Sequence, residues 1–259
     1  MGNLLQQISS RLVETDTLVN EPYSSIIGYP RCSSKELKSR IKELQANDVN
    51  ALLFEGNGKI GKLELLGKGH VSVVVKAIYH GREIALKIRR TDADRATMER
   101  EGEFLRLANS VGVGPTFIKS SRNFLLMDLV KGINIYRFVE SENSREKMVK
   151  VVRKVLEQCY RLDTIGLDHG ELSDMRQHVI VGKVNLKVTI IDFESASVNR
   201  RVSNVTAATQ YLFIGGAVAK KVRKLLKIHS IDPIISSLRN YKNDVSKENL
   251  EGLKQVLNL

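Results

Sequence analysis

The chain has 259 residues, of which 42% are hydrophobic and 27% charged, so it can bury a core and is not expected to be intrinsically disordered. Lys and Arg number 41 against 29 Asp and Glu, and the formal net charge of +12 at pH 7 favours acidic partners such as nucleotides, RNA or ribonucleoprotein. The two cysteines, Cys32 and Cys159, exclude a disulfide framework or a zinc ribbon and suit a reducing cytoplasm.

The sequence carries no sign of membrane attachment or export. Its apolar runs are of strand length, well short of the roughly 18–20 residues of a transmembrane helix. Gln6 stands where a myristoylation signal needs Ser or Thr, and no basic segment leads into a cleavable apolar run. We therefore expect a cytoplasmic protein that makes no membrane contact.

Residues 1–60 are predicted to form a helical N-terminal extension. Within it, Ser33 and Glu36 have the spacing of a capping box, and Leu37, Ile41 and Leu44 repeat at helical spacing. The extension is expected either to dock a partner or to cover the domain that follows.

Residues 61–131 change to a β pattern. Runs 62–66, 71–79 and 82–90 are rich in Val and Ile, and His80-Gly81 between the last two is typical of a tight hairpin turn. A helix is predicted over 92–109, and two hairpin strands follow at 116–120 and 124–130. These elements predict an antiparallel five-stranded sheet with one inserted helix.

Residues 132–259 are predicted to be mainly helical. A long amphipathic helix over 144–163 places Cys159 on its buried face. A turn-rich segment, 166–178, precedes short strands at 179–181 and 186–192, and helices follow from about residue 206. The helix over 217–229 carries a basic stripe that is more typical of a solvated face than of a nucleic-acid contact: Lys220, Lys221, Arg223, Lys224 and Lys227.

The first candidate site is the small-residue segment 67–74, between two predicted strands. Gly67, Gly69 and Ser72 would let backbone N–H groups approach phosphates, although an ordinary tight turn has the same pattern. Lys87 emerges from the next apolar strand. Glu101 has the helical phase of the buried residues around it, and a buried carboxylate needs a cation, for which Lys87 is the nearest candidate.

The second candidate site combines residues 169–174 with Asp192, which ends an apolar strand. A carboxylate at a strand end, Asp192, opposite a loop that carries another, Glu171 or Asp174, would suit a hard metal such as Mg²⁺, completed by phosphate and water. The five histidines form no His-x₃-His or His/Cys cluster, so a structural metal site is not expected.

The order of these parts resembles the protein-kinase-like fold. The sequence HGEL, at 169–172, is similar to the HGDL of RIO kinases and of the small kinase of the KEOPS tRNA-modification complex, and the chain looks like small archaeal serine/threonine kinases. The resemblance implies an α+β, bilobal fold of the RIO type: a helical extension (1–60), an N-lobe with the antiparallel five-stranded sheet (61–131) and a mainly helical C-lobe (132–259).

The resemblance also implies roles for the site residues. Lys87 would hold the α- and β-phosphates of ATP and pair with Glu101, Asp192 would bind Mg²⁺ or Mn²⁺ at the same triphosphate, and Glu171 would orient the attacking hydroxyl. Met127 would be the gatekeeper, and the backbone of Asp128 to Val130 would meet adenine. The full set implied for the nucleotide is Gly67, Gly69, Ser72, Val74, Ala85, Lys87, Glu101, Met127, Asp128 and Val130.

Three features depart from the family pattern. Glu171 replaces the catalytic Asp and is one methylene longer. The Asn expected to bind the second metal is absent: counting back from the strand at 179 places His178 at this position, counting forward from His169 places Arg176 there, and Gln177 lies between them. The sequence IDFE replaces the IDFG of the family pattern, and no long activation segment follows it. The missing segment favours a partner protein or the chain itself over a free peptide as substrate.

We therefore expect an atypical ATP-dependent serine/threonine kinase. The first alternative is a degenerate kinase that serves as a nucleotide-binding scaffold in an RNA-associated complex, which Glu171 and the missing Asn favour. The second is a small-molecule phosphotransferase, since such enzymes share the fold and also lack an activation segment. The basic composition does not favour the large acidic pocket that this second alternative would need.

Overall fold

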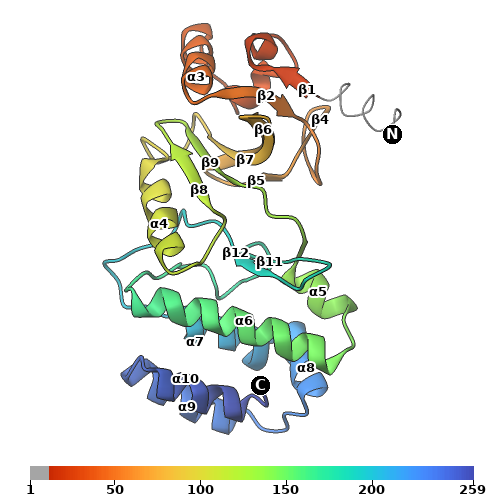
Figure 1. Ribbon diagram of the computed structural model, residues 1–259, viewed down its shortest axis with the longest axis vertical. Coiled ribbons are helices and arrows are strands. Elements are labelled where there is room, and N and C mark those ends of the chain that lie inside the picture. Colours follow the sequence, from red (N-terminus) through yellow and green to blue (C-terminus); the bar gives the residue numbers. More distant parts are fainter. Residues whose placement is uncertain (1–11) are drawn as a thin grey trace. The chain divides into compact units, whose positions relative to one another are not determined.

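The computed structural model describes residues 12–259, which form two compact units (Figure 1). Unit 1 comprises the described residues up to Glu103 together with Thr116–Leu129, and unit 2 comprises Phe104–Pro115 and Val130–Leu259. Unit 1 contains an antiparallel sheet and unit 2 is mainly helical, so the predicted fold class is confirmed. Residues 1–11 of the predicted extension lie outside the described residues.

Unit 1 is built on a seven-stranded antiparallel sheet. Its strands are β1 (Leu12–Glu14), β2 (Val49–Leu53), β5 (Gly67–Lys68), β6 (Ser72–Tyr79), β7 (Arg82–Arg89), β8 (Phe117–Ser120) and β9 (Phe124–Asp128). They follow the order β1-β2-β6-β7-β9-β8, and β5 pairs with β6 as well. A separate two-stranded sheet joins β3 (Gly58–Ile60) to β4 (Leu63–Leu65). The helical segments of this part are the 3₁₀ helix η1 (Thr15–Val19), α2 (Ser24–Ile27), α3 (Ser34–Ala46) and the first residues of α4 (Glu99–Ser110), which continues into unit 2.

The sheet has seven strands where five were predicted, because part of the expected helical extension joins it. Helix α3 begins as predicted, with the Ser33 hydroxyl accepting a hydrogen bond from the Glu36 N–H at 3.2 Å. Strands β1 and β2, however, pair with each other, and β2 pairs with β6. The run VNALL of β2 is too short for its period to separate a strand from a helix. The predicted strand 62–66 forms β4, which pairs with β3 instead of entering the main sheet.

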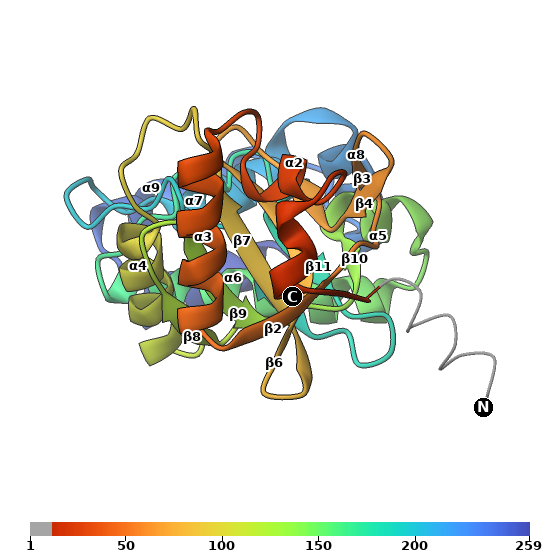
Figure 2. The same cartoon turned by 90° about the horizontal axis from the view of Figure 1, so that it is seen from above.

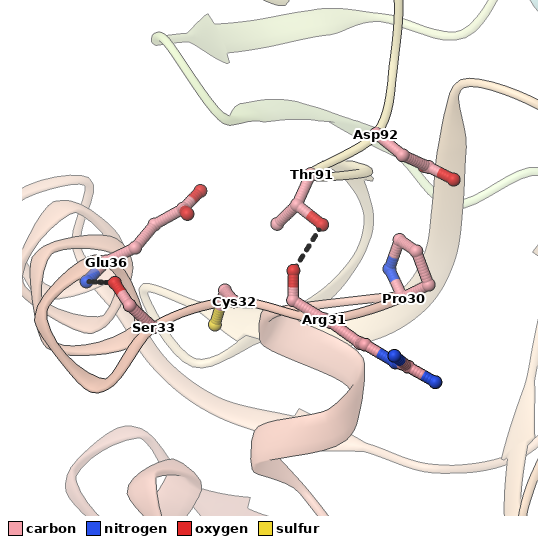
Figure 3. Close-up of a pocket in the computed structure, with 7 residues that line it drawn as sticks. All are labelled: Pro30, Arg31, Cys32, Ser33, Glu36, Thr91 and Asp92. Carbon is pink, nitrogen blue, oxygen red and sulfur yellow. Dashed lines mark hydrogen bonds between the residues drawn. The ribbon is translucent and has the colours of Figure 1, made fainter.

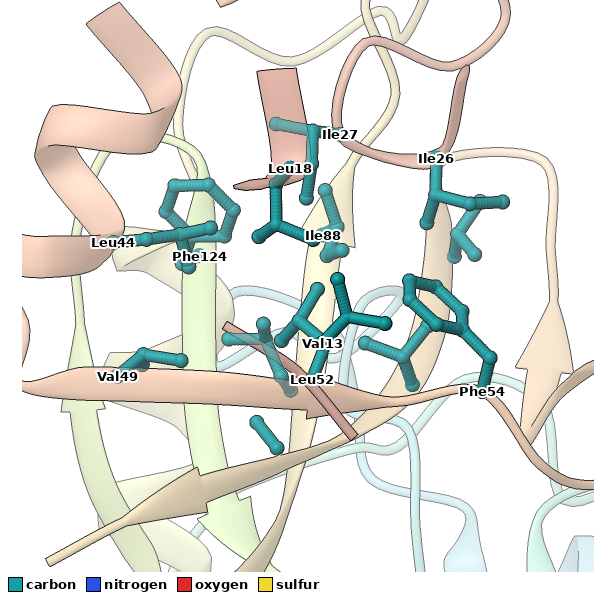
Figure 4. Close-up of a cluster of buried hydrophobic side chains, with 14 of the residues drawn as sticks. Val13, Leu18, Ile26, Ile27, Leu44, Val49, Leu52, Phe54, Ile88 and Phe124 are labelled. Carbon is teal, nitrogen blue, oxygen red and sulfur yellow. The ribbon is translucent and has the colours of Figure 1, made fainter. Parts of the chain in front are cut away.

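The core of unit 1 lies between the sheet and the segments that precede β2. Figure 4 shows Leu18, Ile26 and Leu44 gathered against sheet residues such as Leu52 and Phe124, and all of them are almost completely buried. In Figure 2, α2 and α3 lie over the same face of the sheet. The extension therefore covers this face as part of the hydrophobic core.

Strand alternation then places predicted site residues of β6 and β7, Val74 and Lys87 among them, on the other face of the sheet. Val73, Val75, Leu86 and Ile88 belong to the core cluster. Their neighbours Val74 and Lys87, which are paired in register, point to the opposite face.

Unit 2 is organised around α6 (Arg145–Thr164). This helix begins at Ser144, whose hydroxyl accepts from the Lys147 N–H at 3.3 Å, and its buried face includes Cys159, as predicted. A three-stranded sheet joins β10 (Ile133–Asn134), β11 (Val179–Val181) and β12 (Val188–Ile190). The remaining elements are α5 (Ile135–Ser141), α7 (Asn204–Thr209), the π-helix η2 (Gln210–Ile214), α8 (Gly216–Leu226), α9 (Asp232–Asn243) and α10 (Lys247–Val256).

Two further observations concern helices. Helix α4 begins at Glu99 where the sequence predicted a start near residue 92. Among the described residues, none of the helices has the length and apolar character needed to cross a membrane.

Candidate functional site

The predicted phosphate-binding segment forms a hairpin between β5 and β6. Gly67 pairs with Val74, and the Gly69 N–H donates to the Ser72 carbonyl at 2.8 Å. A Cβ built on Gly67 would meet no atom within 4 Å, so the packing of the chain itself does not demand glycine there. Such free space beside a backbone is what a phosphate loop uses.

Residues from the preceding segment restrain this hairpin, which the sequence did not predict. The ring of Tyr29 lies between two cations, with Lys68 Nζ 4.8 Å and Arg90 Cζ 5.1 Å from its centroid. Arg90 also donates from Nη1 to the Gly69 carbonyl at 3.0 Å and pairs with Asp92 at 2.7 Å. The Tyr29 backbone is anchored in turn, because its carbonyl accepts from the Thr91 N–H at 2.8 Å.

Lys87 and Glu101 form a buried ion pair on the face of the sheet opposite the core cluster. Lys87 Nζ donates to Glu101 Oε1 at 2.7 Å, and the two side chains are only 4% and 2% exposed. Arg95 Nη1 lies 3.7 Å from the second Glu101 oxygen. The carboxylate that the helical phase turned inward therefore meets the cation inferred for it.

The predicted adenine-side residues lie along β9 and just beyond it. Met127 pairs with Ala85, two residues along β7 from Lys87, so both share the Lys87 face. Asp128 ends the strand, and its carboxylate pairs with the exposed Arg82 at 3.2 Å. Val130 is half-buried at the start of unit 2.

In unit 2 a buried hydrogen-bond network fixes the loop that begins at His169. The His169 N–H donates to Asn204 Oδ1 at 2.8 Å, and Asn204 Nδ2 donates to Asp163 at 2.7 Å. Asp163 also accepts from the Tyr241 hydroxyl at 3.0 Å. Burial raises the pKa of Asp163, and these hydrogen bonds to its carboxylate oppose the rise. The sequence did not predict this network, because its members lie far apart in the chain.

The two residues at the start of the loop are held tightly. His169 is fully buried, and its Nε2 donates to the Ile191 carbonyl at 3.0 Å. Burial lowers the pKa of His169 to about 4, so the ring is neutral at pH 7. Gly170 has φ +91°, and a Cβ there would come within 2.7 Å of the Ser195 carbonyl oxygen. Glycine is therefore required at this position.

Glu171, His178 and Asp192 come together beside this loop. Each offers a ligand atom, and these atoms lie within 4.8 Å of one another. Asp192 follows β12 with φ +69°, a conformation uncommon for a residue with a side chain. Phe193 is buried, with its ring 5.1 Å from that of His169.

The structure separates the residues considered for the missing Asn. His178 Nε2 lies 3.6 Å from Glu171 Oε2. Arg176 is exposed and donates instead from Nε to Asp174 at 2.8 Å, and Gln177 is exposed as well. Of these three residues, His178 joins the carboxylates.

The chemistry of this donor set suits a divalent metal ion. Two carboxylates and an imidazole offer oxygen and nitrogen ligands within a few ångströms, as such ions require. The ring of His169, 5.5 Å from that of His178, is turned to the Ile191 carbonyl through Nε2.

A pocket of about 540 Å³ lies elsewhere in unit 1 (Figure 3). Residues 30–36 meet Thr91 there, whose hydroxyl donates to the Arg31 carbonyl at 2.7 Å. Its lining residues are Pro30, Arg31, Cys32, Ser33, Glu36, Thr91 and Asp92. This set shares no residue with the predicted site.

The antiparallel sheet with its buried Lys–Glu pair, together with the His-Gly-Glu loop of a mainly helical unit, defines a protein-kinase-like protein. Comparison with known families narrows this class. The RIO domain model matches residues 70–207, more than half of the 259 residues, and the chain belongs to this family. Membership in this kinase-like family implies the use of ATP and a divalent metal in general.

A curated relative also matches part of the chain, and its name assigns no function. An uncharacterized protein of Methanocaldococcus jannaschii is 32% identical over 108 residues, which are 42% of this chain and 89% of the relative.

Proposed function

We propose that this protein is an ATP-dependent kinase that transfers the γ-phosphoryl group to a Ser or Thr hydroxyl of a partner protein or of the chain itself. The observation that carries the proposal is the buried ion pair between Lys87 and Glu101, at 2.7 Å. Burying an ammonium and a carboxylate costs desolvation free energy. A kinase uses such a pair because the carboxylate holds the ammonium in place to bind the phosphates of ATP.

The residues of unit 1 would bind and orient the nucleotide. Backbone N–H groups of the hairpin at Gly67 and Gly69 would hold phosphate oxygens, and Lys87 would neutralise the charge of the α- and β-phosphates. Ala85 and Met127 would contact the base, because they share the Lys87 face of the sheet. The proposal requires these groups and those of unit 2 to act on one nucleotide.

The residues of unit 2 would orient the acceptor. Glu171 would accept a hydrogen bond from the hydroxyl through Oε1, because Oε2 faces His178, and would take up the proton as the hydroxyl oxygen attacks the γ-phosphorus. The bond from this phosphorus to the β–γ bridging oxygen breaks, and ADP leaves. Asp192 would hold a divalent ion, with His178 and Glu171 nearby, and such an ion neutralises phosphate charge when it is bound.

Labelling with γ-³²P-ATP tests the proposal on the full chain, with Mg²⁺ or Mn²⁺ and with a generic protein acceptor. We expect Lys87→Ala and Asp192→Ala to abolish labelling, because each removes a charge that would neutralise the triphosphate. Lys38→Ala and Asp232→Asn change exposed residues of units 1 and 2 and should label like the wild type. Full labelling by both site variants would refute the assignment.

The alternative of a nucleotide-binding scaffold is still supported by Glu171, which replaces the catalytic Asp of the family pattern. Its carboxylate lies 3.6 Å from His178. Thermal unfolding with and without ATP separates the two functions. Saturating nucleotide stabilises any protein that binds it, by about 2.7 kcal/mol at a hundredfold excess over Kd. Stabilisation without labelling of the chain or of the acceptor would favour a nucleotide-binding scaffold over the kinase.

A further inference from the structure

The path of the chain fixes His178 next to Asp192. The His178 carbonyl accepts from the Ile191 N–H at 2.9 Å, immediately before the paired strands β11 and β12. This bond places His178 opposite the residue that precedes Asp192. The position of His178 is therefore set by backbone pairing as well as by its side chain.

The distance between the His178 and Glu171 side chains is unlike that of a hydrogen bond. Nε2 and Oε2 lie 3.6 Å apart, beyond the usual hydrogen-bond range. Two ligands at about 2.1–2.2 Å from one ion lie roughly 3.0–3.6 Å apart for bond angles near 90–110°. A shared ion would account for the observed spacing.

Two polar groups near Glu171 and His178 are engaged elsewhere. Arg176 is engaged with Asp174, at 2.8 Å. His169 donates through Nε2 to the Ile191 carbonyl at 3.0 Å, so this nitrogen carries a proton and cannot bind a metal. Of the two rings, that of His178 has the nitrogen that lies within 4.8 Å of the Glu171 and Asp192 oxygens.

We propose that His178 is a direct nitrogen ligand of the divalent ion at Glu171 and Asp192, and that this site takes Mn²⁺ in preference to Mg²⁺. The inference rests on the proposed function, since the ion would be the one that serves phosphoryl transfer. Mg²⁺ is bound through oxygen ligands, whereas an imidazole nitrogen suits first-row transition-metal ions. Mn²⁺ is the ion of that series that also favours carboxylate oxygens, as Mg²⁺ does. His178 stands where the family pattern has an Asn, whose side chain would offer an amide oxygen. Replacing that oxygen with an imidazole nitrogen is expected to shift the preference of the site from Mg²⁺ to Mn²⁺.

Electron spin echo envelope modulation of Mn²⁺ tests the ligand directly, with the full chain and a non-hydrolysable ATP analogue. We expect a nitrogen-14 coupling in the wild type that changes on ¹⁵N-histidine labelling and disappears in His178→Asn. His229→Asn removes an exposed histidine and should leave the coupling intact. Mn²⁺ bound without nitrogen coupling, coupling that survives in His178→Asn, or the failure of Mn²⁺ to bind would each overturn the inference.

Metal competition supplies the second measurement. Free Mn²⁺ is counted by its room-temperature resonance as Mg²⁺ is added. We expect His178→Asn to lower the affinity for Mn²⁺ at least about tenfold, because even the loss of an outer-shell partner lowers metal affinity by about this factor. The affinity for Mg²⁺ should change little. An unchanged ratio of the two affinities would also contradict the proposal. If His178→Asn does not fold, His178→Gln replaces it, and the wild-type ¹⁵N experiment still decides whether an imidazole is bound.

These outcomes are separate from those of the labelling experiment. A nitrogen coupling in a protein that does not label would remove the kinase and retain the metal ligand. Labelling without the nitrogen coupling would retain the kinase and exclude His178 as a metal ligand.

Discussion

His169 is the residue whose protonation couples most directly to folding. Its pKa is lowered to about 4, chiefly by burial, and His178 adds to the lowering while Asp168 and Asp192 oppose it. The unfolded chain would bind a proton near pH 6.5, well before the native state does. The contribution of His169 to stability is therefore complete above about pH 6.5 and is lost as the pH falls toward 4.

We predict that this one residue removes about 3 kcal/mol of stability between pH 6.5 and 4. Denaturant unfolding in EDTA should show a smaller loss for His169→Gln than for the wild type, whereas His229→Gln should match the wild type. Because His169→Gln could itself disturb the loop, an NMR titration of the wild-type ring gives an independent measurement. A ring that titrates near pH 6.5 in the native state would contradict the prediction.

At the residue scale, some site residues could be predicted from the local sequence pattern, whereas others depended on the path of the folded chain. The inward direction of Glu101 followed from helical phase, and the structure contains its ion pair with Lys87. The choice between His178 and Arg176 could not follow from counting, because the turn at 171–178 has no regular period.

At the scale of elements, Gly102 controls how closely α4 approaches β8. A Cβ at this position would lie 2.5 Å from Ser120 Oγ and 2.7 Å from Ser120 Cβ. Such contacts force one element to move, and Glu101 lies next to Gly102 in the helix.

We predict that Gly102→Ala destabilises the protein by about 1–3 kcal/mol, as overpacking usually does, and weakens ATP binding by displacing Glu101 from Lys87. Unfolding by denaturant and calorimetric titration with ATP measure the two effects. The double variant Gly102→Ala, Ser120→Gly creates space for the new methyl group and should recover both. Failure of this rescue would show that the contact with Ser120 is not the cause.

Tyr29 links a second pair of elements, because its ring contacts Lys68 of β5 and Arg90, which follows β7. We predict that Tyr29→Ala raises the KM for ATP several-fold with little effect on kcat, since a looser hairpin binds phosphate less well. Tyr29→Phe keeps the ring and should keep the wild-type KM. Equal KM values for all three proteins would argue against a restraint on the hairpin.

The basic stripe of α8 proves to be partly structural. Lys221 donates to the Glu140 carbonyl, and Arg223 donates to the Phe213 and Ile214 carbonyls. Lys220, Lys224 and Lys227 remain exposed. The stripe therefore anchors neighbouring backbone with two of its five members.

At the scale of the whole molecule, the segment before β2 belongs to the core of unit 1. Leu44 is fully buried and packs in that core, whereas Leu12, in the same part of the chain, is 37% exposed. We predict that Leu44→Ala lowers the free energy of unfolding by about 2–5 kcal/mol and Leu12→Ala by much less. Denaturant unfolding measures both. Equal effects would mean that this segment does not share the core.

The sequence by itself determined the fold class, the long helix α6, the hairpin at His80-Gly81 and the direction of Glu101. Each of these depends on periodicity or turn chemistry within about twenty residues, which a sequence displays directly. Only the tertiary structure decided that β2 joins the sheet, that Tyr29 reaches Lys68, that Asp163 supports His169 through Asn204, and that His178 joins Glu171 and Asp192. These contacts join residues brought together by chain folding, and their partners leave no periodic trace in the sequence.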